Sequence, residues 1–139
     1  MRQVLLAALI AILAGCASSV IAPKDASPVP KEFVFAVSEP AASSATAIFT
    51  RDMGGPPGHR WIIYIDGNPA VKLGRGEKYT AWLDPGDHVF GIEPDAKIKV
   101  LQVMNIGQSM SAGKTYFFRA MFTREGYRLQ PSSANVDQH

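Results

Sequence analysis

The chain has 139 residues, enough for one ordinary domain, and its 47% hydrophobic and 19% charged residues are typical of a globular protein rather than a disordered one. The 14 Lys and Arg nearly balance the 12 Asp and Glu, and beyond the N-terminus the cations are spread from Lys24 to Arg128. Because no basic stripe is present, nucleic acid is not an expected partner.

The N-terminal segment has the order of a secretory signal. Arg2 precedes an unbroken apolar run, residues 4–13, and the small residues Ala14 and Gly15 follow. This run is shorter than the roughly 20 apolar residues that cross a bilayer, so a permanent transmembrane helix is not expected. An ordinary signal peptide followed by a chance cysteine, or a buried apolar helix, remains as the alternative.

The four residues Leu13-Ala14-Gly15-Cys16 resemble the lipobox of bacterial lipoproteins. The resemblance implies that residues 1–15 are a cleaved signal peptide and that Cys16 carries diacylglycerol and a further fatty acid such as palmitate. Cys16 is the only cysteine, so it cannot form an intramolecular disulfide. Two or more acyl chains make membrane attachment stable. Ala17, where some lipoproteins have Asp, implies delivery to the outer membrane, facing the periplasm.

The mature chain divides into three parts by composition. Residues 16–31, the lipidated cysteine and an Ala-, Ser- and Pro-rich stretch, are expected to form a tether, with an irregular strand around residues 19–22 as the alternative. Residues 32–131 carry the pattern of a single β domain. Residues 132–139 are polar and aperiodic, and a disordered tail is expected there.

The domain reads as short strands separated by turns. Hairpin turns are expected at Asp66-Gly67-Asn68-Pro69, Asp84-Pro85-Gly86-Asp87 and Arg124-Glu125-Gly126, where Gly, Asp and Pro supply the required backbone angles. This pattern predicts a mainly β fold, a small antiparallel β-sandwich or a partly open barrel. The expected strands are residues 33–37, 46–51, 60–65, 70–73, 79–83, 88–92, 100–106, 115–123 and 127–130.

The strand at residues 60–65 is expected to be central in its sheet. Trp61, Ile63 and Ile65 share one face, while Ile62 and Tyr64 share the other. Both faces are apolar, which is typical of a strand with neighbours on both sides.

The stretch from Trp61 to Ile92, in which an Asp-Gly turn is followed by a short strand, a glycine and a Pro-Gly-x-His turn, resembles the PEGA-type module and related small lipoprotein domains of unknown function. These motifs consist of turn residues, so the resemblance implies a small β-sandwich and specifies the fold better than an activity. It offers no catalytic residues.

His88 is the strongest catalytic candidate, because Asp84 and Asp87 lie near it in sequence. A small periplasmic hydrolase that uses His88 and a nearby aspartate is therefore one hypothesis. We expect instead that the imidazole packs beside Phe90 or bonds the adjoining turn, and that the protein is not an enzyme. A metal site needs three or four convergent ligands, and no such motif accompanies the histidines, so no metal or cofactor is expected. Residues 107–111 lack the features of a nucleophile elbow and are expected to connect two strands.

A binding role is the main expectation. Trp61, Tyr64, Tyr79 and Trp82 could present ring faces to a glycan or peptide if two of them lie on an outer face, and the competing account places them in the core. The loop at residues 51–59, which ends at His59, could carry recognition or be an ordinary connection. We therefore expect a membrane-anchored module that binds an envelope protein or peptidoglycan, or else a surface lipoprotein with no dedicated ligand.

Overall fold

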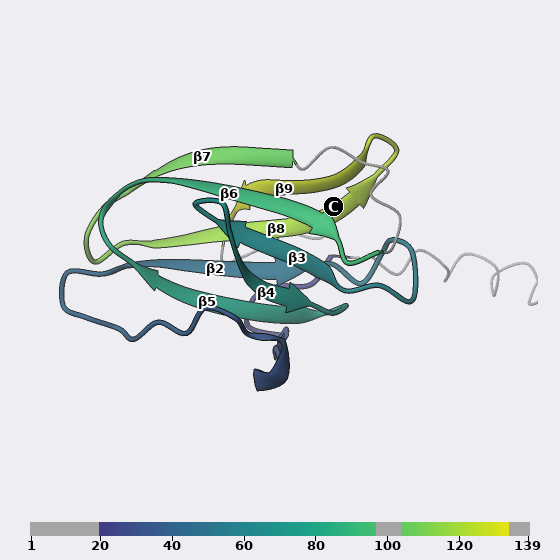
Figure 1. The fold of residues 1–139 in the computed structure, drawn as a ribbon, viewed down its shortest axis with the longest axis horizontal. Helices are drawn as coiled ribbons and strands as arrows, with labels where there is room; N and C mark the ends of the chain where they lie inside the picture. Colours follow the sequence, from purple (N-terminus) through teal and green to yellow (C-terminus); the bar gives the residue numbers. More distant parts are fainter. Residues whose placement is uncertain (1–19, 97–103, 134–139) are drawn as a thin grey trace, which may run out of the picture.

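The computed structural model describes residues 20–96 and 104–133 (Figure 1). The predicted signal peptide, Cys16, the first residues of the expected strand at 100–106 and most of the expected tail lie outside the described residues. No helix in the described part of the chain is long and apolar enough to span a membrane.

Two β-sheets pack face to face, and they do not close into a barrel (Figure 1). Sheet A has the strand order β1-β5-β2-β8-β9, and sheet B has the order β4-β3-β6-β7. All strand pairs are antiparallel except β1 with β5 and β2 with β8. The predicted mainly β sandwich is confirmed. Its strands are β1 (Ser27–Pro28), β2 (Ala45–Arg51), β3 (Trp61–Ile65), β4 (Asn68–Leu73), β5 (Glu77–Leu83), β6 (Gly86–Pro94), β7 (Met104–Met110), β8 (Thr115–Thr123) and β9 (Gly126–Ser132).

The core lies between the two sheets and is built by strand alternation. Phe49 of β2, Phe90 of β6 and Phe118 of β8 meet there, with ring centroids 4.8–5.1 Å apart. Trp61 of β3 packs edge-on against Tyr127 of β9 at 5.1 Å. Each large apolar side chain buried in this way contributes about 1.5–3 kcal/mol, so these rings hold the sheets together.

The strand β3 is central, as its two apolar faces predict, because β4 and β6 flank it. Its hairpin to β4 turns through Asp66 and Gly67, whose φ angles of 50° and 82° are both positive, as in a type I′ turn. The hairpin between β8 and β9 is confirmed as well.

The predicted hairpin at Asp84-Pro85-Gly86-Asp87 is wrong. The turn is present, but β5 pairs with β2 in sheet A whereas β6 pairs with β3 in sheet B. The chain therefore crosses from one sheet to the other here. The same turn residues serve both kinds of reversal, so they indicate that the chain turns and not which strand it joins.

The predicted tether is too long, because the fold includes residues before 32. Ser27 and Pro28 pair with the start of β5, and the ammonium group of Lys78 donates to the Pro23 carbonyl at 2.9 Å. The alternative strand at residues 19–22 is not found among the described ones, residues 20–22.

One expected strand is absent, and β7 is longer than expected. Residues 33–37 do not form a strand: a short 3-10 helix, η1 (Lys31–Phe33), is followed by a single bridge between Val34 and Val71. The amides of Phe35 and Ala36 both donate to the Ala70 carbonyl, so no regular ladder forms. β7 continues to Met110 through residues expected to be a connection, and its outward-facing polar side chains suit the exposed edge of sheet B.

Candidate functional site

The four binding candidates predicted from sequence do not converge on one surface. Trp61 is fully buried between the sheets, and Tyr79 is buried as well. Trp82 is half-buried on the outer face of sheet A, and His59 is exposed in the loop between β2 and β3. The alternative that these aromatic residues lie in the core is therefore right for Trp61 and Tyr79.

The loop after β2 is held from inside by a buried arginine. Arg51 is 1% exposed, and its guanidinium lies 3.8 Å from the centre of the Trp61 ring and donates to the carbonyls of His59 and Leu73. Burial, and then the charge of Arg75, lower the pKa of Arg51 to about 10, so the side chain is still a cation at neutral pH. Next to it, Arg119 forms a two-pronged ion pair with the buried carboxylate of Asp52. These contacts fix the start of the loop, and Arg51 and Asp52 are buried while the Arg119 side chain is 17% exposed.

His88 ties two turns together. Its Nδ1 lies 2.7 Å from the Asp66 carboxylate, and its Nε2 lies 2.7 Å from the Asp84 carbonyl oxygen. Burial alone would lower the pKa of His88, but these two hydrogen bonds and the charge of Asp66 outweigh it and raise the pKa.

This geometry gives His88 no basic nitrogen. An ionised carboxylate and a carbonyl oxygen only accept hydrogen bonds, so His88 donates from both ring nitrogens. A general base needs a free nitrogen lone pair within reach of the nucleophile's proton. In residues 20–96 and 104–133, no three His, Cys, Asp or Glu side chains are placed to hold a metal ion. The interactions of His88 are those expected of a residue that bonds the adjoining turn.

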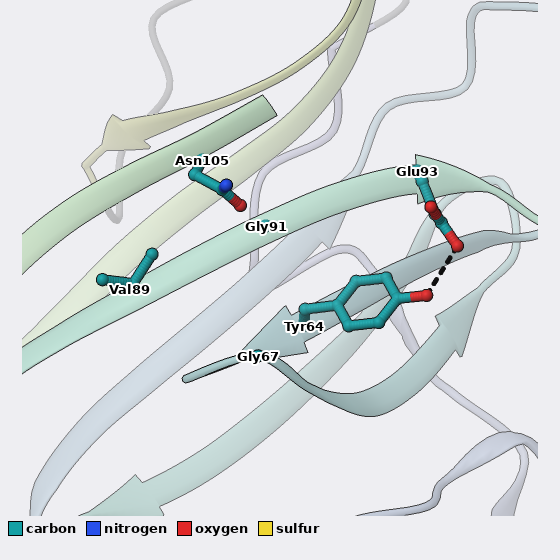
Figure 2. A pocket seen from close by; sticks show the side chains of 6 residues that line it. All are labelled: Tyr64, Gly67, Val89, Gly91, Glu93 and Asn105. Atoms are coloured by element: carbon teal, nitrogen blue, oxygen red, sulfur yellow. Dashed lines mark hydrogen bonds between the residues drawn. The ribbon is translucent and has the colours of Figure 1, made fainter. Parts of the chain in front are cut away.

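A hollow of about 320 Å³ opens on the outer face of sheet B (Figure 2). Strand pairing places Gly91 of β6 directly between Tyr64 of β3 and Asn105 of β7. A glycine in a central strand adds no side chain to the surface, so its backbone forms a low floor between two taller neighbours. The hollow is lined by Tyr64, Gly67, Val89, Gly91, Glu93 and Asn105.

The polar groups of this hollow are partly unpaired. The Tyr64 hydroxyl donates to Glu93 Oε1 at 2.5 Å. Burial, followed by this hydrogen bond and the charge of Glu93, raises the pKa of Tyr64 to about 12, so the phenol stays protonated. Glu93 Oε2 and the Asn105 amide have no hydrogen-bond partner among the described residues. Within residues 20–96 and 104–133, one acceptor and one amide of the hollow are therefore left for a ligand.

A second, larger hollow of about 560 Å³ lies at the side of the sandwich, where Trp82 and Tyr79 meet the segment that crosses from β1 to β2. Two of its polar groups hold the crossing segment: the Tyr79 hydroxyl donates to the Ala36 carbonyl, and Ser38 Oγ accepts from the Trp82 backbone amide. These bonds fasten the crossing segment to the sheet edge. The smaller hollow is the better candidate site because paired strands of sheet B hold its groups in place, whereas one wall of the larger hollow is the irregular segment at residues 34–38.

Sequence reasoning named Tyr64 among the aromatic candidates but missed Glu93, Asn105 and Gly91. A glycine between Phe90 and Ile92 in an apolar strand is a signal that could have been used, because it marks a gap in a sheet surface. The pairing of β3 with β6 and β7, which brings the residues together, could not be read from the sequence.

No known protein family matches the chain, and neither does any curated protein.

Proposed function

We propose that this protein is a lipid-anchored envelope module that binds another envelope component through the outer face of sheet B. The observation that carries the proposal is the hollow on sheet B, lined by the Tyr64 ring together with an amide, Asn105, and a carboxylate oxygen, Glu93 Oε2, that have no hydrogen-bond partner among the described residues. A concave apolar patch with a few convergent polar groups is the usual form of a binding site. The regular β-strands beneath it hold the groups in fixed positions.

The anchor belongs to the same proposal. The lipobox at Leu13 to Cys16 supports acylation of Cys16, and Ala17 supports delivery to the periplasmic side of the outer membrane. Acyl chains confine the domain to the membrane surface. Within that layer the available partners are envelope proteins and peptidoglycan.

Photocrosslinking in living cells tests the proposal. A photoreactive amino acid at Val89, which is 48% exposed and lines the hollow, is expected to capture an envelope component. The matched control is the same group at Val37, which is 81% exposed and lines the second hollow, and it should not capture that component. In parallel, the full chain should be retained on isolated peptidoglycan or yield a discrete crosslinked protein. Absence of both results would contradict the proposal.

A further inference from the structure

We infer that the hollow on sheet B binds an uncharged pyranose ring of an envelope glycan. The inference rests on the proposed function and adds the chemical class of the ligand. A pyranose offers one apolar C–H face and a rim of hydroxyl groups that both donate and accept. The hollow offers the matching set: an aromatic ring and an aliphatic side chain with hydrogen-bonding groups at the edge.

The apolar part of the site is made by Tyr64 and Val89. Figure 2 shows the Tyr64 ring on one side of Gly91, with the Val89 side chain further along β6. The bond from the Tyr64 hydroxyl to Glu93 fixes the ring orientation before any ligand arrives. A ring held in this way loses little conformational entropy when a ligand stacks on it.

The polar part of the site selects hydroxyl groups over anions. Glu93 Oε2 accepts a hydrogen bond, and the Asn105 amide both donates and accepts one. None of the six lining residues is cationic, and Glu93 adds a negative charge, so phosphate or carboxylate ligands would be repelled. An ammonium group would be attracted to Glu93 but would leave the aliphatic wall and the donor of Asn105 without a matching partner.

The size of the site limits the ligand. Its volume of about 320 Å³ is at the lower end of the roughly 300–1,000 Å³ range of ligand pockets. One or two sugar rings fit such a space. A glycan strand would therefore be held at one position along its length, while neighbouring units extend beyond the rim.

Calorimetric titration of the full chain in detergent with two uncharged trisaccharides, chitotriose and cellotriose, tests the inference. We expect at least one of them to bind. Tyr64→Ala and Asn105→Ala should each weaken that binding by about tenfold or more, a change equivalent to about 1.4 kcal/mol. Tyr64→Phe keeps the ring and should weaken it less. Trp82→Ala, an aromatic truncation on the outer face of sheet A, is the matched control and should leave the affinity unchanged.

Circular dichroism and thermal melting of each variant separate lost binding from lost folding. If Tyr64→Ala destabilises the protein, Asn105→Ala decides the test, because Asn105 is exposed on the edge strand β7 and its truncation should leave folding intact. Failure of both sugars to bind would overturn the inference, and so would sugar binding that is lost in Trp82→Ala. The inference would also fall if ethanolamine bound in a manner that depends on Glu93 while neither sugar did. If Val89 still crosslinked to an envelope protein, the proposed function would stand and only the sugar assignment would fall.

Discussion

His88 and Asp66 join the β3–β4 turn to the start of β6, and their interaction depends on two charges. Asp66 Oδ1 also accepts the Val89 amide at 2.9 Å. Burial alone would raise the pKa of Asp66, but the hydrogen bonds from Val89 and His88 and the charge of His88 lower it. The pair therefore stabilises the fold only while Asp66 is ionised and His88 is protonated.

The pH window follows from the direction of each shift. The pKa of His88 is raised above 6.5, so its contribution is fully present below pH 6.5 and is lost as the pH rises through the raised value. The pKa of Asp66 is lowered below 3.8, so its contribution is present above pH 3.8 and is lost as the pH falls through the lowered value. The interaction is strongest between these limits.

Asp66→Asn is expected to destabilise the protein most at about pH 5 and least at about pH 9. Because the Asp66 side chain is 47% exposed, solvent screening limits the charge contribution to about 1 kcal/mol. Thermal melting across this pH range measures the difference from the unmodified protein. Asp84→Asn is the comparison variant: it keeps the backbone-carbonyl bond and removes a charge that acts on His88 more weakly than that of Asp66, so its pH dependence should be smaller. An equal loss at both pH values would contradict the charged pair.

The loop between β2 and β3 depends on close packing at one glycine. Gly55 has φ +96°, and a Cβ there would lie 2.9 Å from Trp61 Cζ2 and 3.0 Å from Phe122 Cβ. Gly58 in the same loop has φ +84°, but a Cβ there would meet no atom within 4 Å. Both positions favour glycine because of their backbone angle, and only Gly55 is also crowded.

Gly55→Ala is expected to lower the free energy of unfolding by about 2–4 kcal/mol, because backbone strain adds to a clash with a buried ring that cannot move. Gly58→Ala should lower the free energy of unfolding by about 1–2 kcal/mol, the cost of the backbone strain alone. Chemical denaturation of both variants gives the two values. Equal costs would show that the loop can shift away from Trp61.

The strand pairings predicted correctly from the sequence are the two hairpins, β3 with β4 and β8 with β9, whose partners are close in sequence. β3 and β4 meet through two residues with positive φ, and alternation of Trp61 and Ile63 with Tyr64 identifies the inner and outer faces. The crossing at Asp84 was not foreseen because its turn chemistry is the same as that of a hairpin. Turn residues do not determine which strand the next segment pairs with, because that pairing depends on the packing of the whole core.

The same limit applies to the candidate site. Tyr64 and Glu93 are far apart in sequence, and Asn105 comes from a strand whose extent was misjudged. Each residue alone is an ordinary outward-facing side chain. Their relation appears only when β3, β6 and β7 are paired in register.

At the scale of the whole molecule, the position of the first folded residues limits how far the domain can stand from the membrane. Pro23 is bound to Lys78 of β5, so the eight residues from Cys16 to Pro23, which make seven Cα–Cα steps, can span at most about 25 Å when fully extended. An acylated Cys16 would therefore keep the sandwich near the bilayer, with the end of the fold that carries Pro23 and Gly76 closest to it.

Cys16→Ser is expected to abolish labelling by palmitate and to move the protein from the membrane fraction to the soluble periplasmic fraction, because in the proposed function the acyl chains supply the attachment. Mass spectrometry of the protein that retains Cys16 should show diacylglycerol on the thiol. Since the described fold makes its core without Cys16, the melting temperature of the variant should match that of the unmodified protein. A bare thiol in the membrane fraction, or a Cys16→Ser chain that is still retained there, would mean that something other than the lipid holds the domain at the membrane.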